Sequence, residues 1–279
     1  MFENFENTLR TTLLLGLLTG IFLAIGYAFA GASGMTYALI LALIMNFIAY
    51  WFSDKIVLSM YGAKQITEPQ NPALHRMVKK LCGEANLPMP RLYKISDKSP
   101  NAFATGRNPK NAAIAVTAGL METLNDDEVE GVLAHEISHI KNHDILVSSL
   151  AATIAGAITY LVQLAYFTGS RGNGERKNGM EMLLMMILAP MAAALVRMAI
   201  SRRREFGADK TGAALSKNPE GLASALQKIA SASTRTRLRG NQATAHMFIV
   251  NPFSGTLGSL FSTHPPVEER IRILKAMKI

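Results

Sequence analysis

Long uncharged stretches alternate with polar, basic segments along the 279 residues of this chain. No residue from Thr11 to Ser53 carries a formal charge, and the glycine-containing cluster at residues 31–34 divides this run into two parts. Each part, Thr11–Ala30 and Met35–Phe52, approaches the roughly 20 apolar residues that a helix needs to cross a bilayer. Because the connection is so short, the pattern predicts a helical hairpin whose two ends return to the same side of a membrane.

A cleaved signal peptide is the alternative interpretation of the first stretch. Ala28-Phe29-Ala30 has the small-residue pattern of a cleavage site. The amino end, however, carries Glu3 and Glu6 against a single Arg10, whereas a signal peptide begins with a positively charged segment. A second apolar stretch also follows within a few residues. We therefore expect the first stretch to remain in place as a membrane anchor.

Two further apolar stretches lie in the second half of the chain. Ile145–Gly169 is 25 residues long and uncharged, which predicts a third membrane-spanning helix. Met182–Val196 has only 15 residues and contains Pro190, so its length fits either a membrane segment or a buried core helix. The pattern predicts about four transmembrane helices and leaves open whether residues 145–200 cross the membrane twice or lie in or on it.

The segment between these apolar regions has the pattern of a small α+β unit. Apolar residues at helical spacing after a proline-rich entry predict a helix over Asn71–Asn86. A second helix start stands at Asn125, which is followed by acidic residues in the first turn and by Glu128 three positions on. Short alternating or apolar runs predict three strands, at Arg91–Ser96, Asn101–Thr105 and Ala112–Thr117.

Charge distribution restricts the class of protein further. The formal net charge is +9, yet 49% of the residues are hydrophobic. Of 29 Lys and Arg residues, 11 lie in Ser53–Asp144 and 13 in Ser201–Ile279, beside the apolar stretches, as on cytoplasmic loops of membrane proteins. Basic residues do not alternate with aromatic ones, and no GxxxxGK[ST] motif occurs, so we expect neither a nucleic acid nor a nucleotide as partner. The single cysteine, Cys82, excludes an intrachain disulfide and is expected to be buried.

The chemistry is indicated by residues 135–139, His-Glu-Ile-Ser-His, on the helix that begins after Asn125. Residues at positions i and i+4 share one face of a helix, about 6 Å apart along its axis, so His135 and His139 can bind one metal ion. Glu136 then lies beside the metal, where it can take a proton from a bound water. This HExxH pattern predicts a zinc-dependent peptidase.

A third protein ligand is needed to complete a catalytic zinc site. His143 lies about 12 Å from His135 along a continuous helix, too far to share an ion, so we expect it at the surface or next to a ligand. Glu205 and Asp209 are better candidates because they again share one helical face. One carboxylate can bind the metal while the other accepts a hydrogen bond from a ligand histidine.

The HEISH motif followed by Glu205-x-x-x-Asp209 resembles the membrane-bound gluzincin peptidases of the HtpX group, which are related to the CAAX prenyl proteases. The resemblance covers almost the whole chain and includes three further features: the amino-terminal hairpin, residues 101–106 (Asn-Ala-Phe-Ala-Thr-Gly), and residues 263–266 (Thr-His-Pro-Pro) with Arg270. It implies His135, His139 and Glu205 as ligands of one Zn²⁺ per chain, and Glu136 as the catalytic residue.

The same resemblance implies a biological setting. It points to an endopeptidase of the bacterial inner membrane, spanning the bilayer several times, whose active site faces the cytoplasm. Its substrates would be misfolded or damaged membrane proteins, so its partners would be protein substrates and the lipid bilayer. Because His139 and Glu205 must meet at one ion, Ile145–Ile200 must cross the membrane an even number of times, or not at all.

The expected fold is a mostly α membrane protein with a small α+β catalytic domain of gluzincin type. We divide the chain into an amino-terminal transmembrane hairpin (1–52), a first catalytic part with the HEISH helix (53–144), a second apolar hairpin (145–200) and a second catalytic part with the third ligand (201–279). The alternative function is that of an interaction scaffold with a structural zinc site. Structural sites usually have a fourth protein ligand and are often rich in cysteine, whereas Cys82 is remote from the motif.

Two further residues are assigned more weakly. His264 is a candidate for stabilising the oxyanion, on its position in the family pattern alone; the alternative is an ordinary loop histidine between turn residues. Asn101, on a predicted edge strand, is a candidate for aligning an extended peptide by strand addition.

Overall fold

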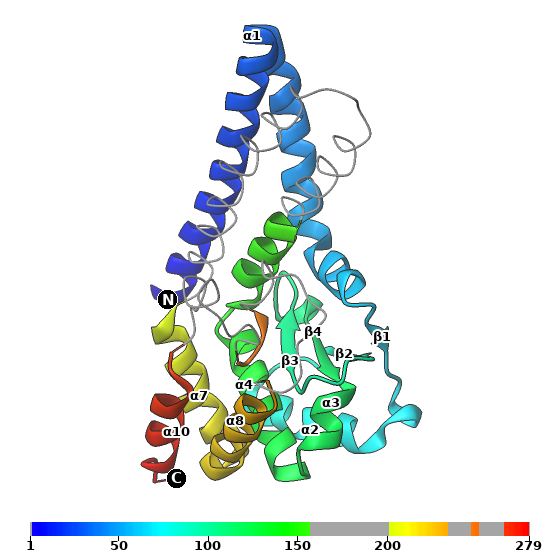
Figure 1. Cartoon of the computed structure of the whole chain (residues 1–279), viewed down its shortest axis with the longest axis vertical. Helices are drawn as coiled ribbons and strands as arrows, with labels where there is room; N and C mark the ends of the chain where they lie inside the picture. Colours follow the sequence, from blue (N-terminus) through cyan, green and yellow to red (C-terminus); the bar gives the residue numbers. More distant parts are fainter. Residues whose placement is uncertain (1, 157–200, 234–246, 251–264, 279) are drawn as a thin grey trace, which may run out of the picture.

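A long helical hairpin stands out from a mixed body of helices and strands in the computed structural model of the chain (Figure 1). The structure describes residues 2–156, 201–233, 247–250 and 265–278. The predicted third membrane segment is helical from Ile145 to Gly156, and its remainder lies outside the described residues, as does the whole fourth segment.

The hairpin is the element α1, Phe2–Met60, which consists of two helices joined at a sharp turn. The turn falls at Ala30 and Gly31, and Gly31 has φ 58°, a left-handed conformation that glycine adopts without strain. Helix resumes at Ala32, so the turn is tighter than the four-residue connection predicted at 31–34. Next to it the two helices approach closely, because a Cβ on Gly26 would lie 2.5 Å from the carbonyl oxygen of Gly34.

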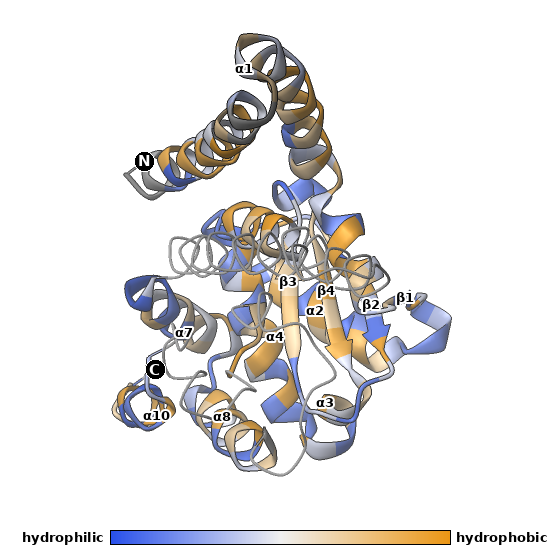
Figure 2. Ribbon diagram, turned by 45° about the horizontal axis from the view of Figure 1, so that its top comes forward, coloured by the Kyte–Doolittle hydropathy of each residue, from blue (hydrophilic) through white to orange (hydrophobic). Residues whose placement is uncertain are grey.

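Apolar residues predominate along the two helices of the hairpin, as the hydropathy colours in Figure 2 show. Among the described residues, every large exposed hydrophobic side chain except Met89 belongs to α1. Two segments, Asn7–Ala24 and Ala30–Met60, are long and apolar enough to cross a membrane. An apolar surface of this extent is stable against lipid, and it would be an aggregation site in water.

The second helix of the hairpin continues to Met60, beyond the predicted end at Phe52. Its last turns are attached to the body by polar contacts. Asp54 pairs with Arg91 at the start of β2, and the guanidinium of Arg107 lies 4.5 Å from the centre of the Trp51 ring. The base of the hairpin is therefore connected directly to the sheet.

The body contains a four-stranded sheet in the order β1-β2-β4-β3. β2 (Arg91–Ile95) pairs in parallel with β4 (Ala113–Thr117), and β3 (Ala102–Thr105) pairs with β4 antiparallel. All three lie where the alternating pattern predicts them. β1 is only Lys64–Gln65, antiparallel to β2, and it is too short to leave a signal in the sequence. β3 forms one edge of the sheet.

Helices cover the sheet and hold the polar site. α2 (Pro72–Ala85), α3 (Ala118–Thr123) and α4 (Asp126–Lys141) belong to the first half of the chain. α7 (Arg202–Ser216), α8 (Pro219–Ser233) and α10 (Val267–Lys275) belong to the second half. Two short 3₁₀ turns, Glu68–Gln70 and Pro109–Asn111, and the helix Ile145–Gly156 are further described elements.

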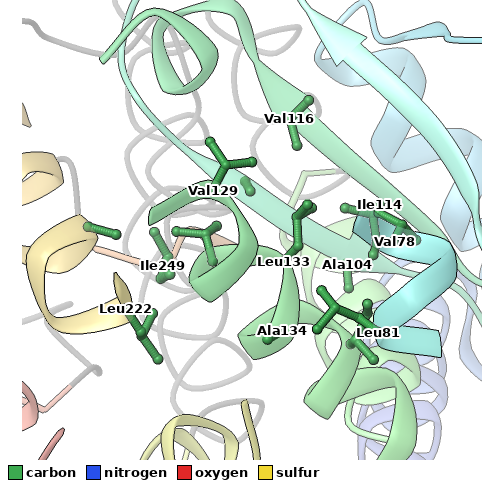
Figure 3. Packing of buried hydrophobic residues seen from close by; sticks show 14 of the residues in the cluster. Val78, Leu81, Ala104, Ile114, Val116, Val129, Leu133, Ala134, Leu222 and Ile249 are labelled. Atoms are coloured by element: carbon green, nitrogen blue, oxygen red, sulfur yellow. The ribbon is translucent and has the colours of Figure 1, made fainter. Parts of the chain in front are cut away.

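α4 lies at the centre of the body and packs against α2, α7, α8 and β3. Figure 3 shows the apolar cluster around it, where Leu133 of α4 faces Ile114 of β4 and Val78 of α2. Cys82 is part of this cluster, as expected from the sequence. Because so many elements meet at α4, the polar residues of its last turns are enclosed by protein.

Small residues allow the second half of the chain to approach α4. A Cβ on Gly212 of α7 would lie 2.9 Å from the backbone nitrogen of His135. A Cβ on Gly131 of α4 would lie 2.6 Å from the backbone nitrogen of Leu222 in α8. The backbone of α7 therefore passes directly against the helix that carries the HEISH motif.

We predict that Gly212→Ala destabilises the protein by about 1–3 kcal/mol, because the added methyl group must push α7 away from α4. Gly207 is the matched control, since it lies on the same helix with open space where a Cβ would stand, and Gly207→Ala should leave stability unchanged or slightly raised. Thermal unfolding of the detergent-purified variants measures both. Equal midpoints for the two variants would contradict the close approach.

Candidate metal centre

The helix α4 starts with a capping box that fixes its first turn. The Asn125 side chain accepts a hydrogen bond from the Glu128 N–H at 3.0 Å, and the Glu128 carboxylate accepts one from the Asn125 N–H at 2.9 Å. Glu128 also accepts hydrogen bonds from Ser224 and Lys228 of α8, at 2.6 and 2.8 Å. The first turn of α4 is thereby fixed to α8, about two turns before the residues of the motif.

Three residues from two helices converge near the end of α4. The Nε2 atoms of His135 and His139 lie 3.2 Å apart, and their rings are perpendicular. Glu205, in the first turn of α7, faces both: its Oε2 is 3.8 Å from His135 Nε2 and its Oε1 is 3.6 Å from His139 Nε2. One donor atom from each residue lies within 4.8 Å of the other two, and all three side chains are buried or nearly so.

Each histidine has a carboxylate on its other ring nitrogen. Asp144 Oδ2 lies 3.1 Å from His139 Nδ1, within hydrogen-bonding geometry. Asp209 Oδ1 lies 3.0 Å from His135 Nδ1, a hydrogen-bonding distance although the angle of approach is poorer. A carboxylate accepts only, so both Nδ1 atoms carry the proton and both Nε2 atoms present a lone pair.

This arrangement fits a divalent metal ion. Two lone pairs facing each other at 3.2 Å, with a carboxylate beside them, repel one another unless a cation lies between them. Two imidazoles and one carboxylate are a donor set that zinc accepts, with one position left for water or substrate. The carboxylates behind the histidines set the tautomer that such binding needs.

Asp209 is itself held by a buried arginine from α10. Arg270 is fully buried and donates two hydrogen bonds of 2.7 Å to the two oxygens of Asp209. Burial alone would raise the pKa of Asp209, but the charge and hydrogen bonds of Arg270 lower it to about 2. Arg270 also donates to the carbonyl of Ile249 at 2.8 Å. The helix α10 is thus connected to His135 through the ion pair between Arg270 and Asp209.

The two histidines of the cluster have different electrostatic surroundings. Burial lowers the pKa of His135, and the hydrogen bond to Asp209 only partly offsets that effect. For His139, burial acts in the same direction, yet the hydrogen bond to Asp144 and the charge of Glu205 outweigh it and raise its pKa to about 9. The negative charge around His139 therefore favours a cation at its Nε2, whether a proton or a metal ion.

Glu136 lies between the His135–His139–Glu205 cluster and the edge of the sheet. It is 4% exposed, and its burial, followed by the charge of Glu205, raises its pKa to about 8. The backbone N–H of Ala104 in β3 donates a hydrogen bond to its carboxylate. Ala104 and Ile114 form a non-hydrogen-bonded pair of the antiparallel ladder between β3 and β4. The backbone N–H of Ala104 therefore faces away from β4, which allows this contact.

The structure brings together most of the residues singled out in the sequence, and it places the others elsewhere. His135, Glu136, His139, Glu205 and Asp209 form one site. His143 is exposed, as expected, in the turn that follows α4. His264 lies outside the described residues.

Asn101 has a different environment from the one expected for a residue that aligns a peptide directly. Its side chain is 1% exposed, and its Oδ1 accepts hydrogen bonds from the N–H groups of Ala102 and Ile249, at 3.0 and 3.1 Å. The side chain therefore holds residues 247–250 against the start of β3. Strand pattern alone does not reveal this, because it gives the position of a residue in a strand and not its long-range partner.

Asp144 was missed by sequence reasoning. It lies three residues after the end of α4 and five residues after His139, and its signal in the sequence was an acidic residue about one turn beyond an HExxH motif. Arg270 was noted as part of the family pattern, without a role.

A metallopeptidase is the class of protein that the fold and the site define. The sequence pattern of peptidase family M48 matches residues 68–278. The chain therefore belongs to peptidase family M48, and its apolar hairpin makes it a membrane metalloprotease.

Within the family, the chain is similar to proteases of the HtpX group. The chain is 54% identical over 277 residues to a protease HtpX homolog of Syntrophobacter fumaroxidans, covering 96% of this chain and 98% of that protein. It is 53% identical over 274 residues to a protease HtpX homolog of Salinibacter ruber, covering 97% and 98%.

A crystal structure of S. mikatae Ste24p is similar in fold, with a TM-score of 0.53 and 19% sequence identity. The similarity covers 96% of this chain and 64% of Ste24p. At this level of identity it shows a shared fold.

We predict that Arg270→Ala strongly destabilises the protein, by roughly 3–5 kcal/mol, because it leaves the buried Asp209 carboxylate without its partner. Arg270→Lys should recover only part of this loss, since an ammonium group cannot make both parallel hydrogen bonds. Arg272→Ala is the control: Arg272 is an exposed residue of the same helix. Thermal midpoints in detergent report the difference, and wild-type stability of Arg270→Ala would refute the role of the pair.

Proposed function

We propose that this chain is a zinc-dependent endopeptidase that cleaves misfolded or damaged membrane proteins at the cytoplasmic face of a bacterial inner membrane. One observation carries the proposal: two histidine Nε2 atoms face each other at 3.2 Å beside Glu205, each histidine with a carboxylate on its other nitrogen. His135, His139 and Glu205 would hold one zinc ion. Bound there, zinc would supply the positive charge that activates a water molecule and polarises a peptide carbonyl.

Glu136 is the residue that would move the protons. It neighbours His135 in sequence and lies within electrostatic reach of both His139 and Glu205. It would take a proton from the attacking water and give it to the leaving amine as the peptide bond breaks. The hydrogen bond from the Ala104 N–H keeps its carboxylate at the boundary between the ligands and β3.

The edge of the sheet suggests how a peptide would be held. β3 is an edge strand, and its register directs the carbonyls of Ala102 and Ala104 away from β4, toward the side on which Glu136 lies. An extended peptide added along β3 would bring its backbone next to Glu136. The four residues of β3 are 7% exposed or less, so this edge must open to admit a peptide. Asn101 would support the strand through the segment it holds, and His264 remains our proposed oxyanion donor.

The setting follows from charge and from the hairpin. The basic residues of the two catalytic parts favour the cytoplasmic side of the membrane. A scaffold with a structural zinc site is the alternative, and such sites are usually closed by a fourth protein ligand. Among the described residues, the cluster has three donors, and a buried glutamate stands beside them. Three metal-binding groups beside a buried glutamate favour a catalytic zinc site over a structural one.

We predict that Glu136→Gln retains about one zinc per chain and loses peptide cleavage, because Glu136 moves protons and does not bind the metal. Glu205→Ala should lose both. Zinc content by mass spectrometry and digestion of an unfolded model protein, with and without a chelator, measure these properties on the same preparations. Cleavage by Glu136→Gln at near wild-type rate would refute the mechanism, and full zinc content in Glu205→Ala would remove it from the ligand set.

We also predict that both parts of the body face the cytoplasm. Lys98 and Lys210 are exposed positions on the two parts, and Ser33 is exposed at the tip of the hairpin. In intact cells an impermeant thiol reagent should label Ser33→Cys and leave Lys98→Cys and Lys210→Cys unlabelled until the cells are permeabilised. Native Cys82 does not interfere, because its burial raises the pKa of its thiol to about 11. Labelling of only one of positions 98 and 210 would contradict the shared site.

A further inference from the structure

A polar residue of the amino-terminal hairpin reaches the metal centre. Asn7 lies near the start of α1, yet it is only 7% exposed. Its Nδ2 donates hydrogen bonds to Asp144 Oδ1 and to the carbonyl of Asn142, both at 3.1 Å. Its Oδ1 accepts a hydrogen bond from Arg204 Nη1 at 3.2 Å. The amide therefore has a partner for its oxygen and two for its nitrogen, which a merely solvated asparagine at a membrane surface would not have.

The partners of Asn7 lead directly to two of the three metal-binding residues. Asp144 uses its other oxygen, Oδ2, to hold His139 Nδ1 at 3.1 Å. Arg204 immediately precedes Glu205 and lies 3.5 Å from Asp144 Oδ1. The side-chain amide of Asn7 thus joins the turn after α4 to the first turn of α7. Its partners Asn142 and Arg204 are 135 and 197 residues away from it in the chain.

Asp144 needs such support because of where it lies. The helix α4 ends at Lys141, and His143 has a left-handed backbone with φ 60°, so Asp144 lies in a turn and not on the regular helix. Only the bond from the Asp144 N–H to the His139 carbonyl, at 2.9 Å, connects its backbone to the motif. The direction of its carboxylate is set by side-chain contacts, and Asn7 and Arg204 hold the oxygen that does not face His139.

We propose that Asn7 is a positioning residue for the metal centre: it orients Asp144, which in turn orients the ligand His139. On this proposal the membrane hairpin is part of the metal site as well as an anchor. The inference rests on the proposed metal binding by His135, His139 and Glu205.

The test measures zinc affinity and the visible absorption spectrum of Co²⁺ bound to the detergent-purified full chain. Asn7→Ala removes both polar groups, and Asn7→Asp keeps the shape and the acceptor while replacing the donor with an oxygen that faces Asp144. Both variants should weaken zinc binding by about 3- to 10-fold, below the 10–100-fold typical for loss of a group that contacts a ligand directly. Both should also change the Co²⁺ spectrum, because the orientation of one imidazole changes.

Asn46→Ala is the matched control. Asn46 also lies on α1 and joins the two helices of the hairpin, through hydrogen bonds to Thr19 Oγ1 at 2.9 Å and to the Leu15 carbonyl at 3.3 Å. It should leave zinc affinity and the Co²⁺ spectrum at their wild-type values. Wild-type affinity and spectrum in both Asn7 variants would overturn the proposal, as would an equal effect of Asn46→Ala. A wild-type chain that binds neither metal would overturn the proposed function, and this inference with it.

Discussion

Two imidazole lone pairs held face to face are the constraint on which the rest of this structure depends. Asp144 accepts a hydrogen bond from His139 Nδ1, and Asp209 lies 3.0 Å from His135 Nδ1, so both Nε2 atoms present electron pairs to the same small space beside Glu205. That arrangement is stable only with positive charge at its centre. Much of the surrounding fold keeps these carboxylates and histidines in place.

The supports of the site come from distant parts of the chain. Arg270 in α10 holds Asp209, and through Ile249 it connects to the segment that Asn101 braces at the start of β3. Gly212 lets α7 approach α4 closely enough for Glu205 to reach both histidines. On the opposite side, Asn7 of the hairpin meets Asp144. Asp209 and Asp144, the two carboxylates beside the histidines, are thus each held by residues from distant parts of the chain.

Patterns within single helices allowed the position of α4 and five residues of the candidate site to be predicted from the sequence. The capping box at Asn125, the i, i+4 spacing of the histidines and the same spacing of Glu205 and Asp209 all act within one helix, so their geometry follows from helical periodicity. The roles of Asp144 and Asn7 could not be found in this way, because they depend on contacts 135 or more residues apart. Asn101 was expected to help align a peptide by strand addition, and its bond to the Ile249 N–H, 148 residues away, could not be found from the strand pattern either.

We propose that His135, His139 and Glu205 form a catalytic zinc site with one open position. X-ray absorption at the zinc edge of the detergent-purified chain tests it most directly. We expect about four nitrogen and oxygen neighbours at roughly 2.0–2.2 Å, with the multiple scattering of two imidazoles and no sulfur. A sulfur neighbour at about 2.3 Å, or the signal of only one imidazole, would contradict it.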